Sequence, residues 1–211
     1  MNFCATITAQ PHENTICAFI HGLDTNEVET IIQRLVYDGR FSRFPSLVPT
    51  ILLDMRLDVA TRNTERTVLL VQEIERDSGM DSQWTTSSSA DDERLKNIHR
   101  IKTDLDFDVK IHDLTTVTAR LSYYTHICKV HLLMPEKLNE INAITVESAP
   151  QVEKDEFKRL EILMRTNNAH LRSYLEGTMI RTEAMLPRVQ AQRDTVSSYR
   201  PEPGASRSKI N

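Results

Sequence analysis

The chain has 211 residues, which suits one large domain or one domain with a helical arm. Its 26 basic and 30 acidic side chains leave a formal charge of −4 without any lysine and arginine run, so composition offers no electrostatic footprint for nucleic acid. Only 5 glycines argue against a loop-rich β fold and favour a helical one.

The chain carries no recognisable targeting segment. Residues 1–10 lack the basic and apolar regions of a secretory signal, and no segment approaches the ~20 apolar residues that span a bilayer. A soluble, cytoplasmic protein is therefore expected. The irregular spacing of Cys4, Cys17 and Cys128 predicts reduced thiols rather than a disulfide framework. The alternative is that Cys4 and Cys17 face each other across a hairpin.

Two β-prone runs open the chain, at residues 4–9 and 15–21, with turn-forming residues between them. They predict a hairpin or a pair of sheet strands. Asp24 and Glu27 then form a capping-box pattern, and apolar residues follow at helical spacing until Gly39. This pattern predicts a helix.

A second, longer helix is predicted after two prolines. Pro45 and Pro49 can bracket its start, because proline is tolerated in a first helical turn. The helix is expected to run to about Asp77. Its two ends are amphipathic, but residues 61–66 are polar on every face. They predict an exposed stretch or a bend.

A linker is predicted at residues 81–92, where five consecutive threonines and serines interrupt the helical pattern. It contains Trp84, interpreted as a side chain tucked on a domain surface, with a binding anchor as the alternative. The linker separates four predicted parts: an N-terminal α/β part with the long helix (1–80), a helical middle region (93–150), a long stalk-like helix (151–196) and a disordered tail (197–211).

In the middle region, we favour a helix from about Asp106 to Met134. The competing interpretation is a short strand at residues 105–111, where apolar and charged residues alternate. Pro135 interrupts the helical pattern, which then continues to Pro150. The expected fold class is thus α+β, mainly α.

The last helix is predicted to begin near Val152 and to kink or break just before Pro187, since an interior proline costs about 3 kcal/mol. Apolar residues recur at heptad-like spacing in this helix and in the middle one. They define a predicted interaction seam: Leu114, Val117, Leu121, Tyr124, Cys128, Leu160, Met164, Leu171 and Leu175. Asn167, Thr178 and either Arg181 or Thr182 are also expected on it. Packing within one domain and pairing between subunits both fit the spacing.

No residue pattern predicts catalysis, because the usual nucleophile, metalloprotease and phosphate-loop motifs are absent. We expect a non-enzymatic protein without a cofactor. Asp104, Asp106 and Asp108 look at first like a calcium loop, but the positions that require Gly and Glu in an EF-hand hold Val109 and Thr115. The three aspartates are the only candidate cation ligands, with a solvated acidic face as the alternative.

Zinc-type ligands also occur together at His126, Cys128 and His131. Residues share a helix face at spacings of three or four, so the three side chains scatter around the axis. Cys128 and His131 alone share a face, and no second pair accompanies them. The pattern does not predict a zinc site.

Three stretches together suggest a family. One is the proline-bracketed segment 44–54, which leads into a long helix; another is the run 114–132, with Leu-Ser-Tyr-Tyr at 121–124; the third is 171–196, with Arg-Val-Gln-Ala-Gln-Arg-Asp at 188–194. With Phe-Ile-His-Gly-Leu at 19–23, they resemble the cytosolic domain of fungal proteins similar to CorA magnesium transporters. The resemblance covers most of residues 15–196. It implies an α/β cytosolic domain and a long helix, usually in a pentamer that senses and conducts magnesium.

The chain departs from this family in several ways. The two membrane helices and the Gly-Met-Asn pore signature are absent, Phe44 replaces a histidine, and the sequence after Asp194 differs. We therefore expect a truncated form that cannot conduct ions alone and lies at a membrane only if the gene model is incomplete. Mg²⁺ would be a weakly bound regulatory ion, and the long helices would form a homo-oligomer. The alternative is an independent helical scaffold or regulatory protein that binds a partner along its seam.

Overall fold

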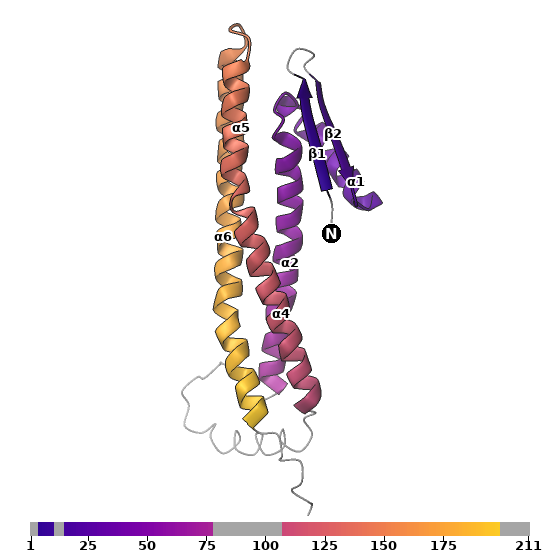
Figure 1. The fold of residues 1–211 in the computed structure, drawn as a ribbon, viewed down its shortest axis with the longest axis vertical. Helices are drawn as coiled ribbons and strands as arrows, with labels where there is room; N and C mark the ends of the chain where they lie inside the picture. The colour runs from indigo at the N-terminus through magenta and orange to yellow at the C-terminus, as the bar shows by residue number, and fades with distance from the viewer. Residues whose placement is uncertain (1–3, 11–14, 78–106, 199–211) are drawn as a thin grey trace, which may run out of the picture. The chain divides into compact units, whose positions relative to one another are not determined.

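The computed structural model describes residues 4–10, 15–77 and 107–198 (Figure 1). It is mainly helical with one two-stranded antiparallel sheet, which confirms the expected α+β, mainly α class. The elements are β1 (Cys4–Gln10), β2 (Thr15–His21), α1 (Thr25–Tyr37), the short 3-10 helix η2 (Gly39–Phe41), α2 (Leu47–Asp77), α4 (Phe107–His131), α5 (Met134–Ser148) and α6 (Lys154–Ser198). The predicted linker with Trp84, the predicted tail from residue 199 onward, Asp104 and Asp106 lie outside the described residues.

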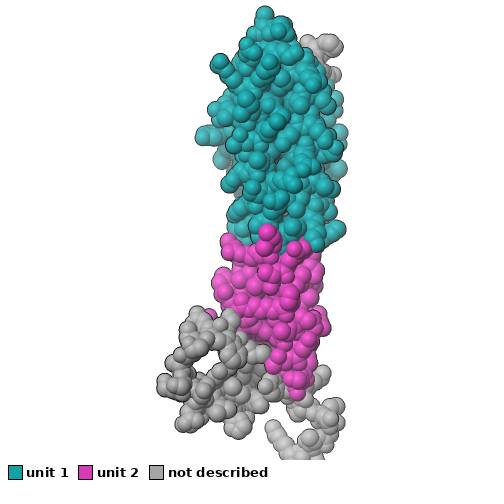
Figure 2. Space-filling view, turned by 90° about the vertical axis from the view of Figure 1, so that its left-hand side faces the viewer, with its two compact units in different colours: residues 1–62, 126–179 teal, residues 63–125, 180–211 magenta. Residues whose placement is uncertain are grey.

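The chain divides into two compact units, each built from separate stretches of sequence (Figure 2). Unit 1 comprises Met1–Arg62 and His126–Met179, and unit 2 comprises Asn63–Thr125 and Ile180–Asn211. Each unit therefore contains part of α2, α4 and α6. None of the helices in the described ranges is apolar over enough of its length to cross a membrane.

The N-terminal hairpin is confirmed. Its antiparallel register places Cys4 opposite His21 and Cys17 opposite Thr8, so the two thiols do not face each other and that alternative is excluded. Alternation along the strands turns one apolar face toward the core of unit 1. That face includes Ala5, Ile7 and Ile20.

The capping box of α1 is also confirmed. The Asp24 carboxylate accepts the Glu27 N–H at 2.8 Å, and the Glu27 carboxylate accepts the Asp24 N–H at 2.9 Å. Two of the orphan donors at the start of the helix are thereby satisfied. Ile31, on the inner face of α1, is buried in the core of unit 1. Gly22, just before the helix, has φ 91°, a conformation that favours glycine.

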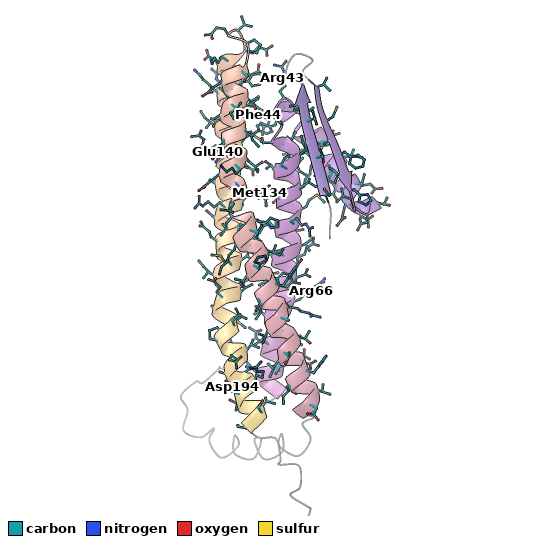
Figure 3. All side chains as sticks on the ribbon, viewed as in Figure 1. Arg43, Phe44, Arg66, Met134, Glu140 and Asp194 are labelled. Atoms are coloured by element: carbon teal, nitrogen blue, oxygen red, sulfur yellow. The ribbon has the colours of Figure 1, made fainter. Side chains whose placement is uncertain are left out.

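The core of unit 1 joins the hairpin and α1 to α2, α5 and α6. Phe44, three residues before the start of α2 (Figure 3), is fully buried. Its ring lies against that of Phe157 of α6, with centroids 5.5 Å apart. A second cluster joins Leu53 and Leu57 of α2 to the later helices. Its other buried members are Cys128, Leu138, Leu171 and Leu175.

Unit 2 packs three helices around one apolar cluster. Val71 and Ile74 of α2 meet α4 and α6 there. The remaining buried members are Leu114, Val117, Leu121, Met185, Val189 and Val196. Because residues 107–111 belong to α4, the favoured helix is confirmed in this region and the competing strand is excluded.

Two sequence expectations are wrong in part. Residues 61–66 do not form an exposed stretch, because Thr61 and Thr64 are buried within a continuous α2; the alternative, a bend, stays a prediction. The helix α6 does not break before Pro187 but runs through it to Ser198, and the predicted kink stays a prediction. Pro187 itself lies on the exposed side, while Met185 and Val189 on either side are buried and anchor the helix.

Candidate functional site: the buried helix seam and its polar layers

The predicted seam residues pack inside the chain. Seven of the nine are buried, whereas Leu160 and Tyr124 are half-buried. At this point of α4, the buried residue is Thr125 rather than its neighbour Tyr124. These side chains contact other helices of the same chain, so a surface for a partner has to lie on other faces.

In α6 the seam follows a regular heptad pattern. Buried residues alternate at spacings of four and three, as in a coiled coil. They are Met164, Asn168, Leu171, Leu175, Thr178, Thr182, Met185, Val189, Gln192 and Val196. Asn168 is fully buried while Asn167 is exposed, so the expectation that Asn167 lies on the seam is wrong by one residue.

Polar side chains hydrogen-bond across the helices of unit 1. The Asn168 Nδ2 group donates to Asn139 Oδ1 of α5 at 2.8 Å, and the hydroxyls of Thr61 and Thr178 lie 3.2 Å apart. Ser46 donates its hydroxyl to Asn142 of α5. Buried polar pairs restrict the register in which helices pack, because a shift leaves both partners without hydrogen bonds.

Unit 2 has its own polar contacts. The Thr125 and Thr182 hydroxyl oxygens lie 2.8 Å apart, and the Arg188 guanidinium binds both carboxylate oxygens of Glu75. The Glu75 side chain is 2% exposed and the Arg188 side chain 34%, so the carboxylate of this ion pair is buried and the guanidinium is half-buried. The sequence pattern does not reveal this ion pair, because a charged side chain is usually interpreted as solvent-exposed.

Two side chains considered as zinc ligands have pKa values shifted by their surroundings. Burial raises the pKa of the Cys128 thiol, which keeps it protonated and unreactive. Burial, reinforced by the positive charge of Arg56, lowers the pKa of His131. Within the described ranges, no group of three or more histidine, cysteine, aspartate or glutamate side chains could hold a metal. Asp108 lies in the first turn of α4.

Large apolar side chains of α5 and α6 remain exposed in unit 1. Ile144 of α5 is 61% exposed and Ile162 of α6 is 60% exposed. Ile141, Leu163 and Tyr174 are exposed to smaller degrees. Single exposed apolar residues are ordinary, and these are the positions of α5 and α6 at which a partner has apolar side chains to contact.

Comparisons with known proteins give no match: no family model fits the chain, and no curated protein or solved structure is significantly similar to it.

Proposed function

We propose that this chain is a non-enzymatic helical domain of the kind found on the cytosolic side of CorA-like divalent-cation transporters, and that it acts by assembly rather than by chemistry. The observation that carries the proposal is α6, a 45-residue helix whose heptad seam packs inside the chain while apolar side chains such as Ile162 stay exposed. The succession of hairpin, short helix, long helix, helix pair and final long helix supports the same proposal.

The seam also indicates how assembly would occur. Its buried side is already used by α2, α4 and α5, which contribute to the same core clusters. Contacts between copies would therefore use exposed side chains of α5 and α6, among them Ile144 and Ile162. In this arrangement the chain supplies a regulatory and assembly domain, and ion conduction requires membrane helices that its described residues do not contain.

Light scattering coupled to size-exclusion chromatography, with Mg²⁺ and with EDTA, tests this function. We expect a cyclic homo-oligomer whose thermal midpoint rises with Mg²⁺ more than with K⁺ at matched ionic strength. A monomer in both buffers, with equal midpoints, contradicts the proposal. The triple substitution Asp104→Asn, Asp106→Asn and Asp108→Asn tests the candidate ligands. An unchanged Mg²⁺ response in that variant excludes them.

A second candidate function is a helical scaffold that binds a different protein. The exposed apolar residues on α5 and α6 favour it, because they would suit a partner helix as well as another copy. The light-scattering experiment separates the two functions. A monomeric chain that binds a defined heterologous helix through Ile144 or Ile162 supports the scaffold.

A further inference from the structure

The helix α1 carries an apolar stripe that stays exposed in the folded chain. Val28, Ile32 and Val36 recur every four residues, so they lie along one side of the helix. Their exposed fractions are 41%, 55% and 79%. The core of unit 1 uses a neighbouring side of α1, through Ile31 and Leu35. The fold of unit 1 therefore does not use this stripe.

The regular spacing distinguishes the stripe from scattered apolar residues. A helix that packs only on its own domain needs apolar side chains toward the core and polar ones elsewhere. In α1, polar residues at the three stripe positions would leave the contacts of Ile31 and Leu35 with the core intact. Apolar residues at helical spacing on an exposed side are the pattern with which one helix packs against another.

The stripe is also symmetric about Ile32. Val28 precedes it by four residues and Val36, an identical side chain, follows it by four, about 6 Å away along the axis in each direction. In an antiparallel pair of α1 helices about a twofold axis, Ile32 meets Ile32 of the partner subunit, and Val28 meets Val36 of the partner subunit. A parallel pair would match apolar residues equally well, so the charges decide the direction.

Charge along α1 favours the antiparallel direction. The cap and the first turns carry acidic residues only, among them Asp24 and Glu29, whereas the other end carries Arg34 and Arg40 with one acid, Asp38. A parallel pair would place the two Glu29 carboxylates side by side, and like charges repel. An antiparallel pair brings Glu29 toward the end that carries Arg40. It also opposes the two helix dipoles, which is the attractive arrangement.

Glu29 and Arg40 are available for such a pair. Arg34 already binds Asp54 of α2, but neither Glu29 nor Arg40 forms an ion pair with any residue in the described ranges. Both side chains are exposed. Charges at the rim of an interface set its direction and partner choice more than its affinity. They therefore point to a second copy in one orientation.

We propose that α1 forms a twofold contact between two copies of this chain. The two stripes pack antiparallel, and Glu29 of each copy pairs with Arg40 of the other. Three apolar side chains from each copy bury less surface than a permanent dimer needs, so the contact is a weak one that forms at high protein concentration. It goes beyond the proposed assembly through Ile144 and Ile162, because it uses a different helix.

Cysteine cross-linking of the full chain tests the register. The exposed Cys4 and Cys17 are first replaced by serine. Ile32→Cys then faces itself across the twofold axis, so mild oxidation should give a disulfide-linked dimer. Val28→Cys and Val36→Cys should link efficiently when mixed and much less when either is oxidised alone. No linkage of Ile32→Cys or of the mixture overturns the contact, and linkage of each valine variant alone at the level of the mixture overturns the antiparallel direction.

Sedimentation velocity over a range of concentrations measures the contact without a cross-link. Ile32→Glu should weaken it about tenfold or more, because two carboxylates come to face each other across the axis. The matched control is Gln33→Glu, which adds the same charge at the next exposed position, off the stripe, and should associate as the original chain does. Equal association of the two variants overturns the proposal. Ile144→Glu should leave the Ile32→Cys cross-link unchanged, so failure of this contact and failure of the assembly through α5 and α6 are distinguishable.

Exchange of the two charges tests the proposed ion pair. Glu29→Arg and Arg40→Glu should each weaken association about fivefold, because each places like charges together. The double variant Glu29→Arg/Arg40→Glu should recover most of this loss, since the pair forms again with its signs exchanged. A double variant that associates no better than either single one overturns the pairing of Glu29 with Arg40.

Discussion

The hydroxyls of Thr125 and Thr182 lie 2.8 Å apart inside unit 2, and the Thr125 oxygen is also 2.9 Å from the Leu121 carbonyl oxygen. Replacing one partner leaves the other with less hydrogen bonding, whereas replacing both leaves an apolar pair of the same shape. We expect Thr182→Val to lower the free energy of unfolding by about 1 kcal/mol. The double variant Thr125→Val/Thr182→Val should be nearly neutral. Urea denaturation followed by circular dichroism measures both.

The matched control is Thr115→Val on the exposed side of α4. Thr115 also donates its hydroxyl to the carbonyl four residues earlier, at 2.8 Å, but in contact with water. Its substitution should change stability by less than about 0.5 kcal/mol. If the loss in the double variant equals the sum of the losses in Thr125→Val and Thr182→Val, the two hydroxyls do not interact.

The ion pair between Arg188 and Glu75 in unit 2 should contribute strongly to the free energy of unfolding. Removing Arg188 leaves the Glu75 carboxylate, 2% exposed, without its bidentate partner. We expect Arg188→Met to cost about 3 kcal/mol, because a buried carboxylate that loses its charged partner is strongly destabilised. Chemical denaturation measures the loss.

A second arginine of α6 provides the control. Arg181 and Glu65 lie 3.6 Å apart with both side chains more than half exposed, at 57% and 56%. Surface pairs of this kind contribute about 1 kcal/mol or less. If Arg181→Met proves as costly as Arg188→Met, burial does not explain the role of Glu75.

His131 should make the stability of unit 1 depend on pH. Its folded-state pKa is lowered from 6.5 by burial and by the positive charge of Arg56. As pH falls through 6.5, the unfolded chain takes up the proton before the folded chain does. Stability is therefore highest above this pH and decreases as the pH falls toward the lowered folded-state pKa. Urea midpoints measured above and below pH 6.5 follow the loss.

In His131→Gln this part of the pH dependence should disappear. His126→Gln, which removes an exposed histidine of the same helix, should retain it because His131 is still present. Identical pH profiles for the original chain and His131→Gln would contradict the assignment to His131.

At the scale of elements, α6 contains a glycine that its packing does not require. A Cβ added at Gly177 would meet nothing within 4 Å. Glycine in a helix is less stable than alanine by roughly 0.5–1 kcal/mol. Gly177→Ala should therefore raise the free energy of unfolding by that amount, as measured by urea denaturation.

Gly22 should respond in the opposite direction. Its φ of 91° lies in the region that L side chains rarely adopt, so Gly22→Ala should cost about 1 kcal/mol or more. A gain at Gly22, or a loss at Gly177, would mean that the backbone conformations in solution differ from those described.

Local chemistry explains which elements could be predicted from sequence. The hairpin and α1 follow from alternation and from a capping box that involves only Asp24 and Glu27. The polar middle of α2 could not be predicted, because the burial of Thr61 depends on a hydroxyl partner, Thr178, far away in sequence. Likewise, the spacing of apolar residues in α6 predicted most of its buried seam. It did not predict that Asn168 rather than Asn167 is buried, because that depends on the hydrogen bond from Asn168 to Asn139 of α5.

At the scale of the whole molecule, sequence spacing does not distinguish a seam inside one chain from a seam between chains, because both have the same period. The structure places Leu171 inside unit 1 and leaves Ile144 and Ile162 exposed. Assembly and folding are therefore expected to respond to different substitutions.

Ile144→Glu and Ile162→Glu should reduce self-association without unfolding the chain, because each places a charge on an exposed apolar position. Light scattering should show a lower mass, while circular dichroism and the thermal midpoint stay close to those of the original chain. Leu171→Glu is the contrasting variant. Leu171 is 2% exposed, and a buried unpaired carboxylate should cost several kcal/mol and abolish cooperative unfolding. If both isoleucine variants keep the original mass, these two faces of α5 and α6 do not carry the assembly.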